Sequence, residues 1–367
     1  MREFWIWLAE ALGAGGRFVA PILEHFGSAQ TVYEFANRET LQEIDGIGPK
    51  EVKALCDKNL KHAETIVKKC EDNGIHILTY EDACYPDGLK HIFSPPLVLY
   101  YRGTLPDFST VPLFTIVGTR KPTKEGERTA YEFAVQMSRR GIWVVSGLAY
   151  GIDTQANRGA VEGPSPTIAV LGCGVDVVYP PSNGVLMDKI MQKGAVISEY
   201  PPGSEPLPHH FPARNRIMAG LSLGVLVVEA PVKSGALITA NMALEDGKEV
   251  FAVPGSIYSP SSVGSNRLLL EGAHPALNAA DIFECFDWEL IEDQEGQNLD
   301  REEEKFEQLS PVEQKIARLL LYHKQLFVDE LADLANISGA QMLSTLTIME
   351  MKGIVKNLGG DVYQVLN

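Results

Sequence analysis

A short arginine-rich motif, residues 211–216 (FPARNR), follows a proline-rich loop and combines charge with an aromatic ring. The guanidinium group of arginine is planar, always charged and carries five donors, which match the oxygens of a phosphate. Burying two unpaired guanidiniums is too costly for a core element. The motif therefore predicts a phosphate-binding site, with a structural ion pair as the alternative for Arg216. Phe211 either stacks on a base or packs in the core.

Six small, polar loops each follow an apolar run and are candidates to join this motif in one site. They are residues 118–122, 146–153, 172–174, 198–201, 229–235 and 254–256. Glycines let a backbone approach a ligand closely, and the N–H groups at helix starts favour anions. No complete Gly-x-Gly-x-x-Gly motif follows the first run, and no Gly-x-x-x-x-Gly-Lys-Ser/Thr motif occurs. The sequence therefore does not favour a dinucleotide or ATP site, and the anion that binds here could be a nucleotide or a polynucleotide.

The elements that must position these loops alternate between strands and helices. Strands are expected at 113–117, 142–145, 167–171, 195–198, 225–229 and 250–253, and helices near 123–140, 152–162, 184–193, 211–221 and 235–246. This alternation predicts an α/β fold with a doubly wound parallel sheet. Ligands of such sheets bind at the carboxyl ends of the strands, so the six loops are expected to converge on one crevice.

The first 72 residues are predicted to form a small helical domain. Their clearest turn, residues 44–50 (IDGIGPK), has the glycine spacing of a helix-hairpin-helix motif. Free N–H groups at Gly46 and Gly48, with Lys50 nearby, form a possible secondary phosphate contact. The alternative is a helical domain that touches no DNA, because Asp45 and Glu51 dilute the charge.

The C-terminal residues 306–367 are predicted to form a winged helix. Residues 310–313 (SPVE) are typical of a capping box with proline at the first helical position. Helices are expected from there to 322, over 328–335 and over 338–352, followed by a small hairpin. The third helix has no arginine or lysine between residues 339 and 351. Reading a major groove needs such side chains, so protein interaction or regulation is favoured over DNA reading.

The net charge of −16 over 367 residues is unevenly distributed. Eleven acidic and two basic residues between positions 284 and 307 carry −9 of it, which predicts an acidic linker over residues 286–305. The remaining −7 leaves room for a local basic pocket but not for a wide basic surface.

The composition also indicates where the chain works. No stretch approaches the roughly 20 apolar residues of a membrane span, and no cleavage site follows the apolar start. Five cysteines, at positions 56, 70, 84, 173 and 285, form no Cys-x-x-Cys pair. This usage favours the reducing cytoplasm and argues against a metal site, as does the lack of spaced carboxylate partners for His209 and His210.

Six motifs in order resemble the DNA-processing DprA/Smf family over residues 76–285. They are residues 117–120 (VGTR), 146–153 (SGLAYGID), 179–183 (YPPSN), 198–201 (SEYP), 211–216 (FPARNR) and 253–255 (VPG). The resemblance implies an extended Rossmann-like domain, flanked by a helix-hairpin-helix (SAM-like) domain and a winged helix. Its members bind single-stranded DNA, protect incoming DNA in natural transformation, assist RecA loading and commonly dimerise. No cofactor is implied. Thr119, where serine is usual, and the pair His209-His210 depart from the family pattern.

The resemblance also implies roles for individual residues. Arg120, Arg214 and Arg216 would contact phosphates, with Lys121 and Lys233 adding charge at the rim. Backbone amides and hydroxyls would come from Gly118, Thr119, Ser146, Gly147, Ser234 and Gly235. Phe211 and Asn215 are candidates for base stacking and hydrogen bonding. Asp153 and Asn183 are expected to brace loops instead of touching ligand.

A nucleotide-processing hydrolase of a related Rossmann fold is the alternative function. Glu199 and Glu229 are expected at strand ends, where a catalytic acid could act. The sequence offers no recognisable nucleophile with its base, so the non-enzymatic interpretation is preferred.

Overall fold

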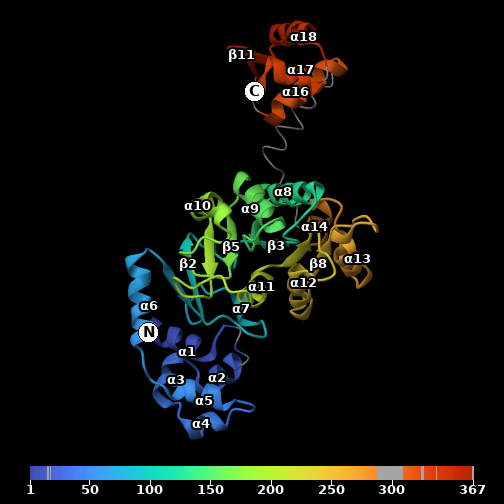
Figure 1. Cartoon of the computed structure of the whole chain (residues 1–367). Coiled ribbons are helices and arrows are strands. Elements are labelled where there is room, and N and C mark those ends of the chain that lie inside the picture. Colours follow the sequence, from blue (N-terminus) through green and yellow to red (C-terminus); the bar gives the residue numbers. More distant parts are fainter. Residues whose placement is uncertain (15, 17, 287–308, 324–325, 336, 366–367) are drawn as a thin grey trace. The chain divides into compact units, whose positions relative to one another are not determined.

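The computed structural model describes the chain except residues 15, 17, 287–308, 324–325, 336 and 366–367. The predicted acidic linker, apart from residue 286, lies outside the described residues. The chain divides into two compact units, Met1–Leu290 and Ile291–Asn367 (Figure 1).

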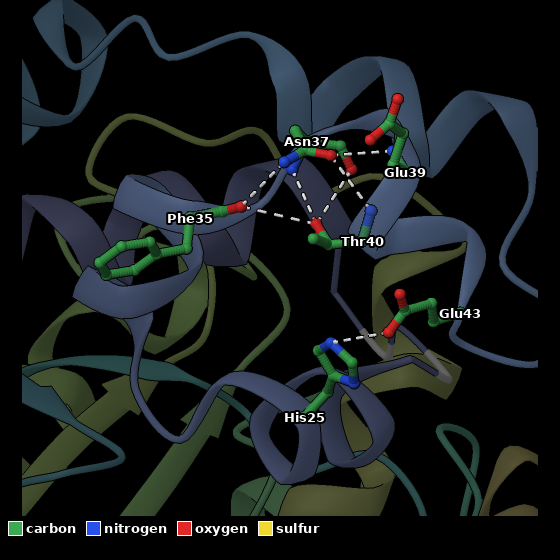
Figure 2. A network of polar contacts seen from close by, with 6 residues as sticks. All are labelled: His25, Phe35, Asn37, Glu39, Thr40 and Glu43. Atoms are coloured by element: carbon green, nitrogen blue, oxygen red, sulfur yellow. Dashed lines mark hydrogen bonds and ion pairs between the residues drawn. The ribbon is translucent and has the colours of Figure 1, made fainter.

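The first unit begins with six helices, whose ends are set by local caps. They are α1 (Arg2–Leu12), α2 (Val19–Phe26), α3 (Ala29–Phe35), α4 (Arg38–Gln42), α5 (Pro49–Cys56) and α6 (Lys61–Asp72). Figure 2 shows the start of α4, where the Asn37 side chain accepts from the N–H groups of Glu39 and Thr40. The Thr40 hydroxyl accepts from the Asn37 N–H in return, which completes a capping box. His25 of α2 lies 3.9 Å from the Glu43 carboxylate at the end of α4.

These helices share a hydrophobic core with the sheet that follows. Trp5, Ile6 and Leu8 of α1 are buried in one cluster with Tyr100 and Val196 of the sheet. The indole of Trp5 donates to Glu81 at 3.1 Å, and Lys69 of α6 donates to the Pro202 carbonyl at 2.8 Å. A separate domain over residues 1–72 stays a prediction.

Among the described residues, nine strands form one sheet in the order β1-β2-β6-β5-β4-β3-β7-β8-β9. They are β1 (His76–Thr79), β2 (Val98–Gly103), β3 (Leu113–Val117), β4 (Trp143–Ser146), β5 (Thr167–Leu171), β6 (Ala195–Ser198), β7 (Gly224–Val227), β8 (Glu249–Ala252) and β9 (His274–Pro275). The pairings from β6 to β9 are parallel, while β2 joins β6, and β1 joins β2, antiparallel. Every residue of β3 and β5 is buried, as in strands covered on both faces.

Helices cover both faces of the sheet (Figure 1). One face carries α8 (Lys124–Arg139), α9 (Ile152–Glu162) and α14 (Ala279–Cys285), packed on Phe114, Ile116 and Phe251. The other carries α11 (His210–Leu221), α12 (Gly235–Glu245) and α13 (Val263–Leu270), packed on Val145, Ile168 and Val225. The helix α10 (Gly184–Lys193) lies against β2, β5 and β6, and the short α7 (Asp87–Lys90) lies against α11.

The predicted doubly wound α/β sheet is thus confirmed, with strand and helix ends within two residues of expectation. The edge strands β1 and β9 and the helices α13 and α14 were not predicted. Strand β9 has only two residues, both exposed, and therefore offers no alternating apolar pattern.

Among its described residues, the second unit has three helices and a small antiparallel sheet. Its elements are α16 (Pro311–His323), β10 (Leu326–Phe327), α17 (Val328–Ala335), α18 (Gly339–Met351), β11 (Val355–Gly359) and β12 (Val362–Val365). Ile316, Leu331 and Leu346 meet in its core. The capping box at Ser310 and Glu313 is present, since each side chain accepts from the backbone N–H of the other.

Candidate nucleic-acid interface

The strand order reverses between β3 and β7. From β3 the chain winds outward through β4, β5 and β6, and from β7 it winds the opposite way through β8 and β9. The loops after β3 and β7 therefore diverge and leave a crevice at the carboxyl ends of the strands. A pocket of about 610 Å³ lies there. The predicted site residues that line it are Gly118, Thr119, Arg120, Lys121, Phe211, Arg214, Asn215, Lys233, Ser234 and Gly235.

The loop after β3 is fixed by its own backbone. The N–H of Thr119 donates to the Glu229 carbonyl at 2.7 Å, and the Thr119 hydroxyl accepts from the Lys121 N–H at 3.2 Å. A side chain at Gly118 would strike Ile152, since a β-carbon there would lie 2.5 Å from it. The glycine thus lets α9 pack close, and the loop leaves Arg120 and Lys121 exposed at the pocket.

Phe211 at the start of α11 supports the Arg120 guanidinium. The centre of that guanidinium lies 5.1 Å from the ring centroid, within cation–π range. The same half-buried ring contacts Tyr179, with centroids 5.3 Å apart, and a β-carbon at Gly172 would lie 3.1 Å from it. The ring therefore contacts both Tyr179 and the Arg120 guanidinium.

Arg214 and Asp153 form a buried group of opposite charges at the floor of the pocket. Both are almost fully buried, and the Arg214 guanidinium donates to the Val170 carbonyl. A β-carbon at Gly147 would lie 2.4 Å from that guanidinium and 2.5 Å from the Asp153 carboxylate. The place of a side chain at Gly147 is thus taken by the two charged groups.

Burial dominates the acid–base properties of this group. It raises the pKa of the Asp153 carboxyl, although Arg214 and backbone hydrogen bonds from Ala149 and Gly147 oppose the rise. Burial likewise lowers the pKa of the Arg214 guanidinium, against the attraction of Asp153, and Arg120 adds to the lowering by repulsion. Both arginines line the same pocket, and the lining contains one acid, Asp153.

The start of α12 forms the opposite wall of the pocket. Ser234 caps this helix of 11 residues, because its hydroxyl accepts from the Ala236 N–H at 3.3 Å. Asn215 donates to the Gly235 carbonyl at 3.2 Å and so ties α11 to this end of α12. Thr239 also lines the pocket, and its buried hydroxyl has no hydrogen-bond partner among the described residues.

Three predicted site residues, Ser146, Gly147 and Arg216, do not line the pocket. Ser146 is buried in the sheet, where its hydroxyl donates to the Ile116 carbonyl at 2.7 Å. Arg216 forms a buried ion pair with Glu199 at 2.5 Å, which is the alternative weighed for it. Asn183, as expected, braces a loop by donating to the Leu148 carbonyl at 3.0 Å.

The residues predicted to make a secondary phosphate contact, Gly46, Gly48 and Lys50, lie at the start of α5 and do not line the pocket either. Gly46 adopts a positive φ of 75° in this turn, and Gly48 is the residue before the helix. A β-carbon at Gly48 would lie 2.5 Å from the Glu51 carboxylate, so an acid already occupies the space at this helix start. Lys50 is exposed beside it.

The two glutamates considered for a hydrolase are both engaged in structural contacts. Glu199 pairs with Arg216, and Glu229 accepts from the Thr123 hydroxyl and, at 3.0 Å, from the Thr123 N–H. Thr123 caps α8, so Glu229 stabilises the start of that helix.

Sequence reasoning missed several pocket residues, among them Thr239, Met218, Pro260 and Ser261. Asp153 was expected to brace a loop, yet it lines the pocket. Thr239 lies four residues after Gly235, one helical turn along the same face, and this spacing was the available signal. Pro260 and Ser261 follow β8 through a loop whose path no local pattern defines.

No helix in the described parts of the chain is long and apolar enough to span a membrane.

Comparison with known proteins places the chain in a family. The family model described as DNA recombination-mediator protein A matches residues 76–287. The DNA processing protein DprA of Streptococcus pneumoniae is 44% identical over 207 residues, which are 56% of this chain and 73% of that protein.

The solved structures that resemble this chain include two of DprA proteins. The X-ray structure of DprA from Streptococcus pneumoniae has a TM-score of 0.67 at 35% identity and covers 77% of this chain and 98% of that chain. DprA from Helicobacter pylori, whose structure is titled for its single-stranded DNA binding mode, has a TM-score of 0.53 at 30% identity, with coverage of 57% and 95%. Since the family model spans more than half of the residues, the chain belongs to the DNA recombination-mediator protein A family (DprA/Smf).

Proposed function

We propose that this chain is a recombination mediator that binds single-stranded DNA in the pocket at the switch point, where the strand order reverses between β3 and β7. The observation that carries the proposal is the convergence of four cations, Arg120, Lys121, Arg214 and Lys233, on a pocket with one buried acid. The Helicobacter pylori relative with a titled single-stranded DNA binding mode supports it. The pocket volume of about 610 Å³ lies in the usual range for a ligand site.

In the proposed complex the exposed cations bind the DNA backbone. Arg120 stands at the rim with its guanidinium supported by Phe211, so a phosphate approaching from solvent meets it first. Lys121 and Lys233 flank it as further point charges. Arg214 acts from the floor as a fixed charge whose Nε has no partner among the described residues.

Neutral groups complete the proposed site. The N–H groups at Gly235 and the capped start of α12 suit a phosphate oxygen, and the unpartnered Thr239 hydroxyl offers a further donor. Gly118 and Thr119 shape the loop, and Gly147 makes room for Arg214 and Asp153. Phe211 and Asn215 remain the candidates to contact a base.

The wider role includes protection of incoming DNA in natural transformation, assistance in loading RecA and action in the cytoplasm, all proposed from family membership. The proposed domains are a helix-hairpin-helix (SAM-like) domain over 1–72, the Rossmann-like DNA-binding domain over 76–285, an acidic linker over 286–305 and a winged helix over 306–367. The lack of basic residues in α18 supports a regulatory or protein-binding winged helix.

A homodimer is part of this proposal. Four large apolar residues between the end of β8 and the start of α14, Ile257, Tyr258, Leu270 and Leu277, are each more than three-quarters exposed. Isolated exposed apolar residues are common, but several along one stretch favour burial against another protein surface. A second copy of the chain is the proposed occupant, and Leu270→Glu is expected to yield a monomer in light scattering.

The test is a mobility shift with single-stranded and duplex oligonucleotides of equal length across a salt series. We expect preference for the single strand, with a shallow slope reflecting about three to five phosphates per protomer. Phe211→Leu keeps apolar volume but loses the ring, and is expected to weaken binding by about 1–3 kcal/mol if a base stacks there. Equal affinity for duplex, or binding independent of salt, contradicts the pocket assignment.

A further inference from the structure

Three side chains of different chemistry meet at the sheet edge formed by β8 and β9. They are Glu249 at the start of β8, His274 in β9 and Cys285 at the end of α14. Their ligand atoms, a carboxylate oxygen, an imidazole nitrogen and a thiol sulfur, all lie within 4.8 Å of one another. The closest pair is Nε2 of His274 and Oε2 of Glu249, at 2.8 Å.

The scaffold holds these three positions together through packing below them. His274 is in register opposite Phe251 in the parallel pair of β8 and β9, and its ring centroid lies 5.1 Å from that of Phe251. Phe286, the residue after Cys285, packs on Phe114 and Phe251 at 6.1 Å each. The end of α14 is therefore packed against β3 and β8.

This donor set suits a metal ion of intermediate softness. Carboxylate, imidazole and thiolate together are ligands that Zn²⁺ accepts, whereas Mg²⁺ and Ca²⁺ prefer oxygen alone. We propose that Glu249, His274 and Cys285 form a Zn²⁺ site, with water completing a tetrahedral shell.

The geometry requires a small rearrangement. Tetrahedral Zn²⁺ with bonds of about 2.0–2.3 Å places its ligand atoms roughly 3.3–3.7 Å apart. The Glu249 and His274 ligand atoms, 2.8 Å apart, must separate slightly, and any wider gap within the 4.8 Å span must close. All three side chains are exposed, which gives them the freedom to change rotamer. No cysteine spacing motif announces the site, because its ligands lie 25 and 11 residues apart in the sequence.

Bound zinc would link two strands and a helix at one edge of the first unit. Its expected consequence is higher stability of that unit, because a ligand that binds only the folded state shifts the unfolding equilibrium. The three ligands do not line the pocket at the switch point, so this proposal and the proposed DNA binding can fail independently.

The first test uses Co²⁺ as a spectroscopic probe of the reduced full-length chain, followed by displacement with Zn²⁺. We expect a thiolate-to-cobalt charge-transfer band that Cys285→Ser abolishes. His274→Ala and Glu249→Gln are expected to weaken Zn²⁺ binding at least about tenfold, the lower end of the cost of losing a supporting group at a metal site. Cys56→Ser and Cys84→Ser, which alter the other two exposed cysteines, are matched controls and should leave the band unchanged.

The second test measures the thermal midpoint with and without Zn²⁺. The wild-type chain should gain stability with zinc, and the Cys285→Ser chain, with the same midpoint as wild type in chelator, should gain none. A cobalt band that survives in Cys285→Ser, or a wild-type chain that neither binds nor is stabilised by zinc, overturns the proposal and leaves Glu249 and His274 as an ordinary surface pair.

Discussion

Helix α11 contributes Arg214 to the pocket and Arg216 to a buried ion pair. The two regions therefore use the same type of side chain in opposite ways. Arg214 and the exposed Arg120 line a pocket whose lining contains a single acid, Asp153. On the other side, Arg216 is matched one to one by Glu199, and each side chain is only 9% exposed. A guanidinium is thus available to an anion only where acids are outnumbered.

The glycines around the pocket make room for other groups. Around the pocket, Gly118 and Gly147 admit Ile152 and the Arg214–Asp153 group into space that a side chain would fill. These glycines are required by packing around the cations, and their approach to a ligand is a secondary benefit. The arrangement teaches that the loops hold charges in place as much as they offer amides.

The largest expected effect comes from breaking the ion pair. Arg216→Ala should destabilise the protein by about 3–5 kcal/mol, because Glu199 is left charged and buried. One oxygen of Glu199 already lacks a partner among the described residues. Urea unfolding measures the change.

The matched control replaces both partners, as Arg216→Met with Glu199→Leu. This double variant should recover most of the stability, since no charge remains buried, and should bind single-stranded DNA like wild type. Loss of DNA binding in a stable double variant would mean that Arg216 contacts DNA, and the contrast drawn between Arg214 and Arg216 would be wrong.

The next effect concerns the exposed cation. Arg120→Ala should weaken single-stranded DNA binding by about 1.5–3 kcal/mol, the range for a charge-assisted hydrogen bond, with little change in stability. Arg128→Ala is the control, because Arg128 is exposed on α8 and pairs with Glu132 at 2.6 Å. Fluorescence anisotropy with a labelled oligonucleotide compares the two variants. Equal losses would mean that general charge, and not the pocket, determines affinity.

Much of the fold followed from the sequence because its core strands are continuous apolar runs separated by glycine-rich loops. The run at β5 and the helix at α9 were predicted with their observed ends, residues 167–171 and 152–162. Edge strand β9 could not be predicted, because two exposed residues pair only through the neighbouring β8.

The candidate site was predictable only in part, for a related reason. Loop positions next to strand ends identify which residues converge, and ten of the predicted residues do line the pocket. The sequence does not show which acid faces which cation, since Glu199 lies 17 residues before Arg216 and meets it only through the fold. Thr239 was missed although it lies one helical turn after Gly235, and its unpaired hydroxyl becomes evident only in the structure.

A smaller effect on DNA affinity is expected at the start of α5, where the Glu51 carboxylate lies next to Gly48 of the glycine turn. Glu51→Gln removes the carboxylate beside Gly48 and leaves a helix start that favours anions. We expect DNA binding to tighten by about 0.3–1 kcal/mol at low salt and to return to the wild-type value as salt screens the charge. Lys50→Ala in the same background should reverse the gain. An unchanged affinity in both variants at low salt would mean that this turn does not approach DNA.

The smallest effect is expected from the C-terminal unit. Removing residues 305–367 should leave the affinity for single-stranded DNA nearly unchanged, because α18 carries no cation and the pocket lies wholly in the first unit. Cutting from residue 287 onward also removes the acidic stretch and should tighten binding slightly at low salt, where repulsion reaches further. Anisotropy titrations of both truncated chains, with circular dichroism to show that they are folded, measure the difference. If a folded truncation loses binding while Arg120→Ala binds normally, the cations of the switch-point pocket are not the DNA site, and the second unit must supply it.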